Sequence, residues 1–226
     1  MRGEVLHAPG AVTGHESSMP LQNRVLPTGE IIAHPARGMF MGNRGILHDD
    51  SKTLMKRRWQ HTHWVTCRTE FKDRKRAPMS PGNYTELFFL DEAVSLAAGH
   101  RPCAECRRSA YMRFRTRFDM ANGTSTLPAL DQMLHRDRVT RRREQIRFEA
   151  LLETLPDGTM VLYRHHPHLV LRNSLLRYTP EGYTEQIARP DGMVTVLTPR
   201  STVATLALGY IPELHGSSER FADTSQ

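Results

Sequence analysis

The sequence is poor in cysteine: three stand among its 226 residues, too few for a disulfide framework. It has no apolar run near the roughly 20 residues that a membrane-spanning helix needs. Residues 1–18 lack the apolar core of a secretory signal. These absences argue against a membrane protein and against a disulfide-rich secreted protein. They predict a cytoplasmic protein whose reduced thiols are available to bind metal.

Positive charge, in contrast, is abundant in the middle of the chain. The net formal charge is +7, and residues 56–76, 101–117 and 136–147 carry +6, +5 and +4 respectively. The net charge of the remaining residues is therefore about −8. Such concentrated basic segments are typical of surfaces that bind phosphate groups, so the predicted partner is nucleic acid, with DNA favoured. The alternative is that each segment is only a solvated, arginine-rich face.

Cys103 and Cys106 form a Cys-x-x-Cys pair within the run Gly-His-Arg-Pro-Cys-Ala-Glu-Cys-Arg-Arg, residues 99–108. The two thiolates of such a pair lie at one tight turn and suit two corners of a tetrahedral zinc site. Cys67 is the only other cysteine and is the predicted third ligand. The sequence therefore predicts a Zn²⁺ ion held by at least three cysteines.

Several residues are candidates for the fourth ligand of that site. His63 is the first choice because it lies four residues before Cys67. His61 lies on the same face of the expected strand, and His100 lies three residues before Cys103. An acidic side chain or water remains a further alternative. We expect the zinc to be structural, and the alternative is a catalytic ion with an open water position.

Local sequence patterns predict an α+β fold. The segment 24–47, broken repeatedly by proline and glycine, is interpreted as short strands and turns. Asp91 is a favourable N-cap and Gly99 a favourable stop for a helix between them. The expected helices are 92–98, 104–120, 128–153 and 201–208. The expected later strands are 59–66, 84–90, 160–163, 168–171, 175–178 and 194–197.

Met41-Gly42-Asn43-Arg44-Gly45 is interpreted as a plain turn. The alternative is a glycine loop around an anion, with Arg44 as its positive charge. It lacks the length and the Lys-Ser/Thr ending of a P-loop.

The run Leu87–Cys106 resembles the Ada-type zinc-binding module. The likeness consists of an aromatic strand, a short helix ending in Ala-Gly, and then Arg-Pro-Cys-x-x-Cys, and it covers residues 59–108, about a quarter of the chain. His63 followed by Cys67 matches one form of the family's upstream ligand pair, whereas Phe71 stands where the other form has a cysteine. The resemblance implies a compact zinc-stabilised fold that lies against a DNA backbone.

In that family one zinc-bound thiolate accepts a methyl group from a DNA phosphotriester, and Cys67 matches this acceptor. The resemblance therefore makes Cys67 a candidate catalytic residue. Glu86, which precedes a strand close to the site in sequence, is a candidate general base. Most of the chain is also similar to uncharacterised bacterial proteins, a likeness that implies no activity.

The predicted organisation follows from these features. A tail, 1–18, and a tail, 217–226, are expected to be disordered. The zinc-binding Ada-like module with its N-terminal strands is 19–120, a linker with an arginine-rich helix is 121–154, and a small β-rich unit is 155–216.

The predicted function is zinc-dependent binding of nucleic acid, with a role in DNA repair or modification. The residues expected to face phosphates are Arg101, Arg107, Arg108, Arg141, Arg142 and Arg143. One alternative is a zinc-using enzyme that acts on DNA as a nuclease, a glycosylase or an alkyl acceptor. The other is an adaptor between proteins, in which zinc only stabilises the fold.

Overall fold

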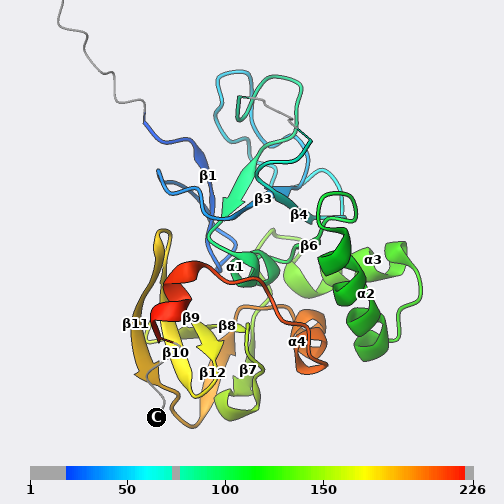
Figure 1. Ribbon diagram of the computed structural model, residues 1–226. Coiled ribbons are helices and arrows are strands. Elements are labelled where there is room, and N and C mark those ends of the chain that lie inside the picture. The colour runs from blue at the N-terminus through cyan, green and yellow to red at the C-terminus, as the bar shows by residue number, and fades with distance from the viewer. Residues whose placement is uncertain (1–18, 73–76, 222–226) are drawn as a thin grey trace, which may run out of the picture.

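The computed structural model describes residues 19–72 and 77–221, which form two six-stranded sheets with a short helix between them (Figure 1). This arrangement confirms the predicted α+β fold. The first sheet has the order β2-β1-β5-β3-β4-β6. Its strands are β1 (Gln22–Val25), β2 (Ile31–Ala33), β3 (Phe40–Asn43), β4 (Val65–Arg68), β5 (Leu87–Phe89) and β6 (Arg101–Pro102).

The second sheet is antiparallel and has the order β11-β10-β9-β8-β12-β7. Its strands are β7 (Phe148–Leu151), β8 (Met160–Tyr163), β9 (His166–Leu171), β10 (Ser174–Thr179), β11 (Gly182–Ala188) and β12 (Met193–Val196). β8, β9, β10 and β12 lie within two residues of the predicted strands. β7 and β11 were not predicted.

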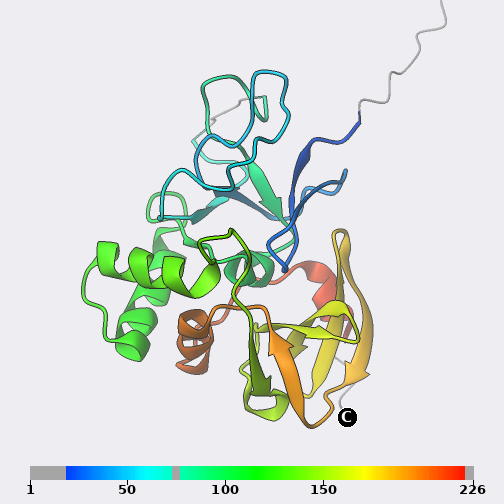
Figure 2. The ribbon, with the colours of Figure 1, turned by 180° about the vertical axis from the view of Figure 1, so that it is seen from behind.

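The helices are α1 (Glu92–Ala97), α2 (Arg108–Asn122), α3 (Leu127–Arg138) and α4 (Arg200–Ala207), with 3-10 turns at Leu152–Thr154 and Gly216–Phe221. Seen from behind in Figure 2, α2, α3 and α4 gather at one side of the molecule. Phe114, Leu130 and Leu206 belong to one apolar cluster that joins these three helices. None of the helices in the described part of the chain is long and apolar enough to cross a membrane.

α1 begins and ends where the sequence predicts. The Asp91 side chain accepts a hydrogen bond from the Val94 amide at 3.0 Å, which caps the first turn. At the other end Gly99 has φ +79°, a conformation that favours glycine. The Gly99 amide donates to the Leu96 carbonyl and the His100 amide to the Ser95 carbonyl, both at 2.9 Å. This is a Schellman motif, and it turns the chain directly into β6.

A shared core joins the two units that the sequence predicts as separate. Phe40 and Leu87 of the first sheet, Val94 of α1, and Met160 and Leu176 of the second sheet belong to one buried cluster. Apolar burial of this kind is the main favourable term in folding. The β-rich unit is therefore packed against the rest of the protein through α1.

Buried polar contacts strengthen the same junction. Asp91 Oδ2 accepts a hydrogen bond from the Tyr183 hydroxyl at 2.7 Å. Glu92 Oε1 accepts one from the Tyr210 hydroxyl at 2.6 Å, and Glu92 Oε2 accepts one from the Glu213 amide at 2.8 Å. Polar groups buried in this way have to be hydrogen-bonded, so the start of α1 fixes the C-terminal segment.

The predicted helix over 128–153 is wrong in its second half, because α3 ends at Arg138. Thr140 Oγ1 instead accepts hydrogen bonds from the Arg142 and Glu144 amides, at 3.1 and 3.3 Å. A threonine hydroxyl that bonds nearby amides competes with the helix, and the adjacent arginines repel one another. The chain turns here and continues into β7.

Three other predicted boundaries also need correction. The strand expected at 59–66 begins only at Val65, because Trp64 Nε1 donates to the His61 carbonyl at 2.9 Å and holds a local turn. The helix expected from residue 104 begins at Arg108. Ser217, in the expected C-terminal tail, is buried and accepts a hydrogen bond from the Tyr183 amide at 2.9 Å. Residues 1–18, the other expected tail, lie outside the described residues.

Candidate metal centre

Two parallel strands bring the cysteines together. β4 pairs with β6 so that Val65 lies opposite Arg101 and Thr66 opposite Pro102. The Cys103 amide donates to the Thr66 carbonyl at 2.9 Å, which places Cys103 beside Cys67. A tight turn then returns the chain toward Cys67 before α2 begins. The pairing explains how cysteines far apart in sequence become neighbours.

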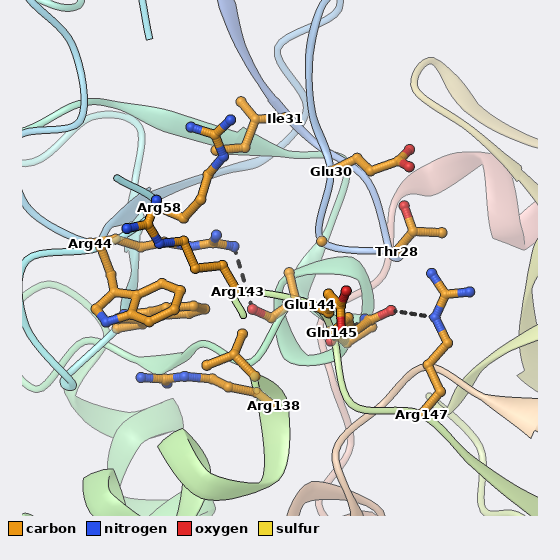
Figure 3. A pocket seen from close by; sticks show the side chains of 16 residues that line it. Thr28, Glu30, Ile31, Arg44, Arg58, Arg138, Arg143, Glu144, Gln145 and Arg147 are labelled. Atoms are coloured by element: carbon orange, nitrogen blue, oxygen red, sulfur yellow. Dashed lines mark hydrogen bonds between the residues drawn. The ribbon is translucent and has the colours of Figure 1, made fainter. Parts of the chain in front are cut away.

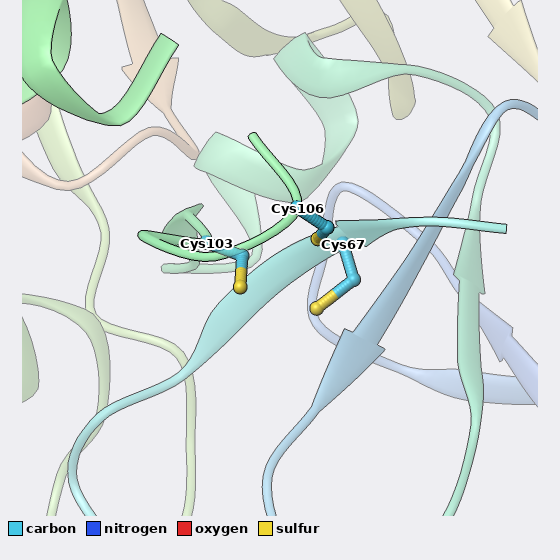
Figure 4. A group of neighbouring side chains, drawn as sticks. All are labelled: Cys67, Cys103 and Cys106. Carbon is cyan, nitrogen blue, oxygen red and sulfur yellow. The ribbon is translucent and has the colours of Figure 1, made fainter. Parts of the chain in front are cut away.

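The predicted cysteine ligands converge on one point (Figure 4). The sulfur atoms of Cys67, Cys103 and Cys106 all lie within 4.8 Å of one another. Each side chain is half-buried. Three thiolates at this separation can hold a metal ion.

The protein backbone favours negative charge on the Cys103 sulfur. The Glu105 amide donates to the Cys103 sulfur at 3.4 Å. Hydrogen bonds from the thiols of Cys106 and Cys67, together with backbone amides, lower the pKa of Cys103. The same contacts and burial raise the pKa of Cys67, since a second anion would lie close to the first. A bound cation removes that repulsion, so metal binding and loss of the thiol protons are coupled.

The candidate histidine ligands lie outside this group. Among the described residues, the cysteine sulfurs form a group that includes no histidine or carboxylate. His63 is exposed and stacks on His61, with ring centroids 3.8 Å apart. His100 is completely buried, and its Nε2 accepts a hydrogen bond from Arg44 Nε at 3.1 Å. The structure therefore brings together three of the four predicted ligands.

The cysteines open onto a cavity of about 690 Å³ that Glu86 also lines. Glu86 is buried, and its Oε2 accepts a hydrogen bond from the Met79 amide at 2.7 Å. The sequence placed Glu86 near the site only by its position in the chain. The structure adds that the candidate base and the three sulfurs border the same space.

Two of the predicted phosphate contacts are instead structural, and the first is Arg101. Its side chain is buried and makes two hydrogen bonds to Asp131, from Nε at 2.7 Å and from Nη2 at 2.8 Å. A guanidinium that is buried and bonded in this bidentate way is not available to a nucleic acid. Arg101 joins the strand before Cys103 to α3.

Arg107 is the second predicted phosphate contact that is instead structural. Its side chain is buried, lies 2.8 Å from a Glu92 carboxylate oxygen and stacks over the ring of Phe40. Composition reveals the positive charge of such a residue but not the carboxylate that neutralises it. Arg107 therefore belongs to the buried contacts at the start of α1.

The other predicted phosphate contacts lie at the surface. Arg108 is exposed at the start of α2, and Arg141 and Arg142 are exposed in the turn after α3. Within the described ranges, none of these three side chains forms an ion pair with a carboxylate. Arg143, also exposed, donates from Nη1 to the Lys56 carbonyl at 2.8 Å. These four arginines are therefore at the surface, and their contact with phosphate stays a prediction.

A second cavity, of about 530 Å³, was not predicted from the sequence. We call it the arginine cavity, because five arginines line it: Arg44, Arg58, Arg138, Arg143 and Arg147. In the view of Figure 3, the first four gather on one side and Arg147 lies on the other, beside Gln145. Glu30 and Glu144 also line it, so its formal charge is +3. The run around Arg44 and the basic window 136–147 were visible in the sequence, but their convergence was not.

The innermost arginines of this cavity pack on a tryptophan. The guanidinium carbons of Arg44 and Arg138 lie 4.0 and 3.7 Å from the ring centroid of Trp64. Arg138 also donates to the Gly99 carbonyl at 2.7 Å. Burial and the two arginines lower the pKa of His100 well below its usual range, so its ring is neutral and accepts from Arg44.

Comparison of the chain with models of known protein families, with curated proteins and with solved structures found no match.

Proposed function

We propose that the protein binds a zinc ion through Cys67, Cys103 and Cys106 and binds nucleic acid, with DNA favoured, through its exposed arginines. The convergence of the three sulfurs within 4.8 Å carries this proposal. Zinc suits the site because thiolates are soft ligands and because zinc accepts tetrahedral sulfur coordination. The backbone amide at the Cys103 sulfur stabilises the thiolate form that zinc requires.

The nucleic-acid part of the proposal rests on exposed positive charge. Arg108 is exposed at the start of α2, and Arg141 and Arg142 are exposed in the turn after α3. Phosphate binding by such residues releases counterions from DNA, so the affinity falls steeply with salt concentration. The bidentate geometry of guanidinium groups also suits phosphate oxygens. The supported role is contact with the backbone, which carries no base specificity by itself.

The first experiment measures the metal content of protein purified without added metal, together with DNA binding at two salt concentrations. We expect one zinc per chain, and binding that weakens strongly as salt is raised. Arg141→Gln should lower the slope of log K against log salt by about one. Arg164→Gln, an exposed charge in the turn between β8 and β9, is the matched control and should leave the slope unchanged. Protein that is purified without zinc, or a DNA affinity that does not change with salt concentration, contradicts the proposal.

A second candidate function is an enzyme that acts on DNA at the same centre. The observation that favours it is the cavity shared by Glu86 and the three cysteines. In alkyl transfer, the Cys67 sulfur would take a methyl group from a phosphotriester oxygen and leave a phosphodiester anion. The test incubates the zinc-loaded protein with methylated phosphotriester DNA and determines the mass of the peptide that contains Cys67. Cleavage or base loss in the DNA would instead indicate hydrolysis, with Glu86→Gln as the variant that should abolish it.

A further inference from the structure

The lining of the arginine cavity has more positive than negative charge, with five arginines against two glutamates. Among the residues that the structure places, none of its five arginines forms an ion pair with a carboxylate. Arg44 and Arg138 are almost completely buried, at 3% and 2% exposure. Buried charges are usually paired, because removal from water costs several kcal/mol for each ion. A protein that keeps two such groups at a cavity wall has a site suited to an anion.

The groups that hydrogen-bond these two arginines are uncharged, and the carboxylate that acts on Arg138, that of Asp131, is already bonded to Arg101. Arg44 donates to the ring of His100 and, at 3.4 Å, to the Ala98 carbonyl. Arg138 donates to carbonyls, and its buried Nε has no partner within the described part of the chain. Burial, with Arg58 nearby, lowers the pKa of Arg44 to about 9, so Arg44 still carries its charge at neutral pH. An anion in the cavity that these groups line would offset the repulsion.

We propose that the arginine cavity binds a phosphate group of a nucleotide, either free in solution or at the end of a nucleic-acid strand. Several guanidinium groups around one small space suit the oxygens of a phosphate, which accepts bidentate hydrogen bonds from more than one arginine. A volume of about 530 Å³ lies in the range of sites for small ligands.

The walls of the cavity also suit the remainder of a nucleotide. Trp59 is half-buried and lines the cavity, so its ring offers an aromatic surface for a base. Glu30 and Glu144 line the cavity too, and their carboxylates can accept hydrogen bonds from sugar hydroxyls. The same carboxylates disfavour a second, closely spaced phosphate. The cavity therefore fits a monophosphate better than a polyphosphate.

The observations behind this inference do not include the candidate metal centre, and only its strand-end form rests on the proposed function. The experiment measures binding by calorimetry at constant ionic strength with a nucleoside monophosphate, the matching nucleoside and inorganic phosphate. A second series compares a short oligonucleotide carrying a 5′-phosphate with the same oligonucleotide carrying a 5′-hydroxyl. The test variant is Arg143→Gln with Arg147→Gln, because both residues are exposed and line the cavity.

The matched control is Arg164→Gln with Arg220→Gln, which removes the same charge at exposed positions that neither line the cavity nor belong to the proposed nucleic-acid contacts. We expect the test variant to weaken phosphate binding roughly ten-fold or more, and the control to leave it within about two-fold. Thermal unfolding without ligand should be alike for the two variants, since all four residues are exposed.

If the protein binds the monophosphate but not the nucleoside, and only the test variant weakens this binding, a free nucleotide is supported as the ligand. Preference for the 5′-phosphate strand with the same pattern supports a strand end. Equal weakening by both variants, or no response to any phosphate, overturns the inference. Salt-sensitive DNA binding without phosphate discrimination overturns this inference alone, whereas nucleotide binding without DNA binding overturns only the proposed function.

Discussion

Replacement of Asp131 by asparagine tests whether Arg101 is structural or is a phosphate contact. The substitution keeps the shape of the side chain and one acceptor oxygen, but removes the charge that faces the buried guanidinium. The wild-type pair is bidentate, with distances of 2.7 and 2.8 Å, and both side chains are less than a tenth exposed. The variant therefore leaves Arg101 buried with a neutral partner.

The expected loss of stability follows from this geometry. Two unit charges with centres about 4 Å apart attract by roughly 4 kcal/mol at an effective dielectric constant of 20. Removal of one partner from a buried pair costs about 3–5 kcal/mol. Because asparagine retains one hydrogen-bond acceptor, we expect about 3 kcal/mol for Asp131→Asn. For a chain of this size, that corresponds to a fall in Tm of roughly 6–12 °C.

The assay is urea unfolding of the protein as purified, with Glu185→Gln as the control. Glu185 pairs with Arg177 at 3.5 Å at the surface, so its loss should cost less than about 1 kcal/mol. A structural Arg101 predicts a large loss of stability for Asp131→Asn and little change in DNA affinity per folded molecule. Equal, small losses for both variants, or tighter DNA binding by Asp131→Asn, would refute the reasoning.

The remaining predictions concern the turn after α1, one buried histidine and the metal. Gly99→Ala would place a Cβ 2.4 Å from Arg138 Cδ in a strained backbone, so urea unfolding should show a free energy of unfolding lower by more than roughly 2 kcal/mol. The control is Gly123→Ala, whose Cβ meets nothing within 4 Å and which should lower the free energy of unfolding by about 1 kcal/mol. Because the folded pKa of His100 is lowered, unfolding takes up a proton below pH 6.5. Stability should therefore fall on acidification by up to about 1.4 kcal/mol per pH unit, and His100→Gln should reduce that slope in denaturation curves across pH 5–8. Chelation should lower the Tm and make all three thiols reactive to a thiol reagent; unchanged reactivity would contradict a metal centre.

The sequence predicted best those features that depend on neighbouring residues. The start and end of α1 follow from Asp91 and Gly99, whose hydrogen bonds reach only a few residues along the chain. The Cys-x-x-Cys turn is equally local. The end of α3 was missed because a single hydroxyl, that of Thr140, decides it against a favourable helical pattern. Two local signals compete there, and the periodicity of the apolar residues favours the wrong one.

The charged residues were harder to assign because charge does not reveal its partner. Arg101 and Arg107 lie in the same basic window as Arg108, yet two are buried against carboxylates and one is exposed. Their partners lie elsewhere in the chain, Asp131 on α3 and Glu92 on α1. The net charge of residues 101–117 can be counted from the sequence. Which of these charges are exposed to a ligand could be found only from the fold.

The candidate metal centre and the arginine cavity depend on the same pair of strands. β4 follows Trp64, which packs on the two buried arginines, and carries Cys67 toward its other end. The Trp64 carbonyl accepts the Arg101 amide at 3.1 Å, and β6 leads from there to Cys103. An ion that joins Cys67 to Cys103 therefore also fixes the register of β4 on β6, and with it the ring that supports the cavity. A metal with a purely structural role would in this way pre-organise the phosphate site, and by linkage a bound phosphate would strengthen metal binding in return.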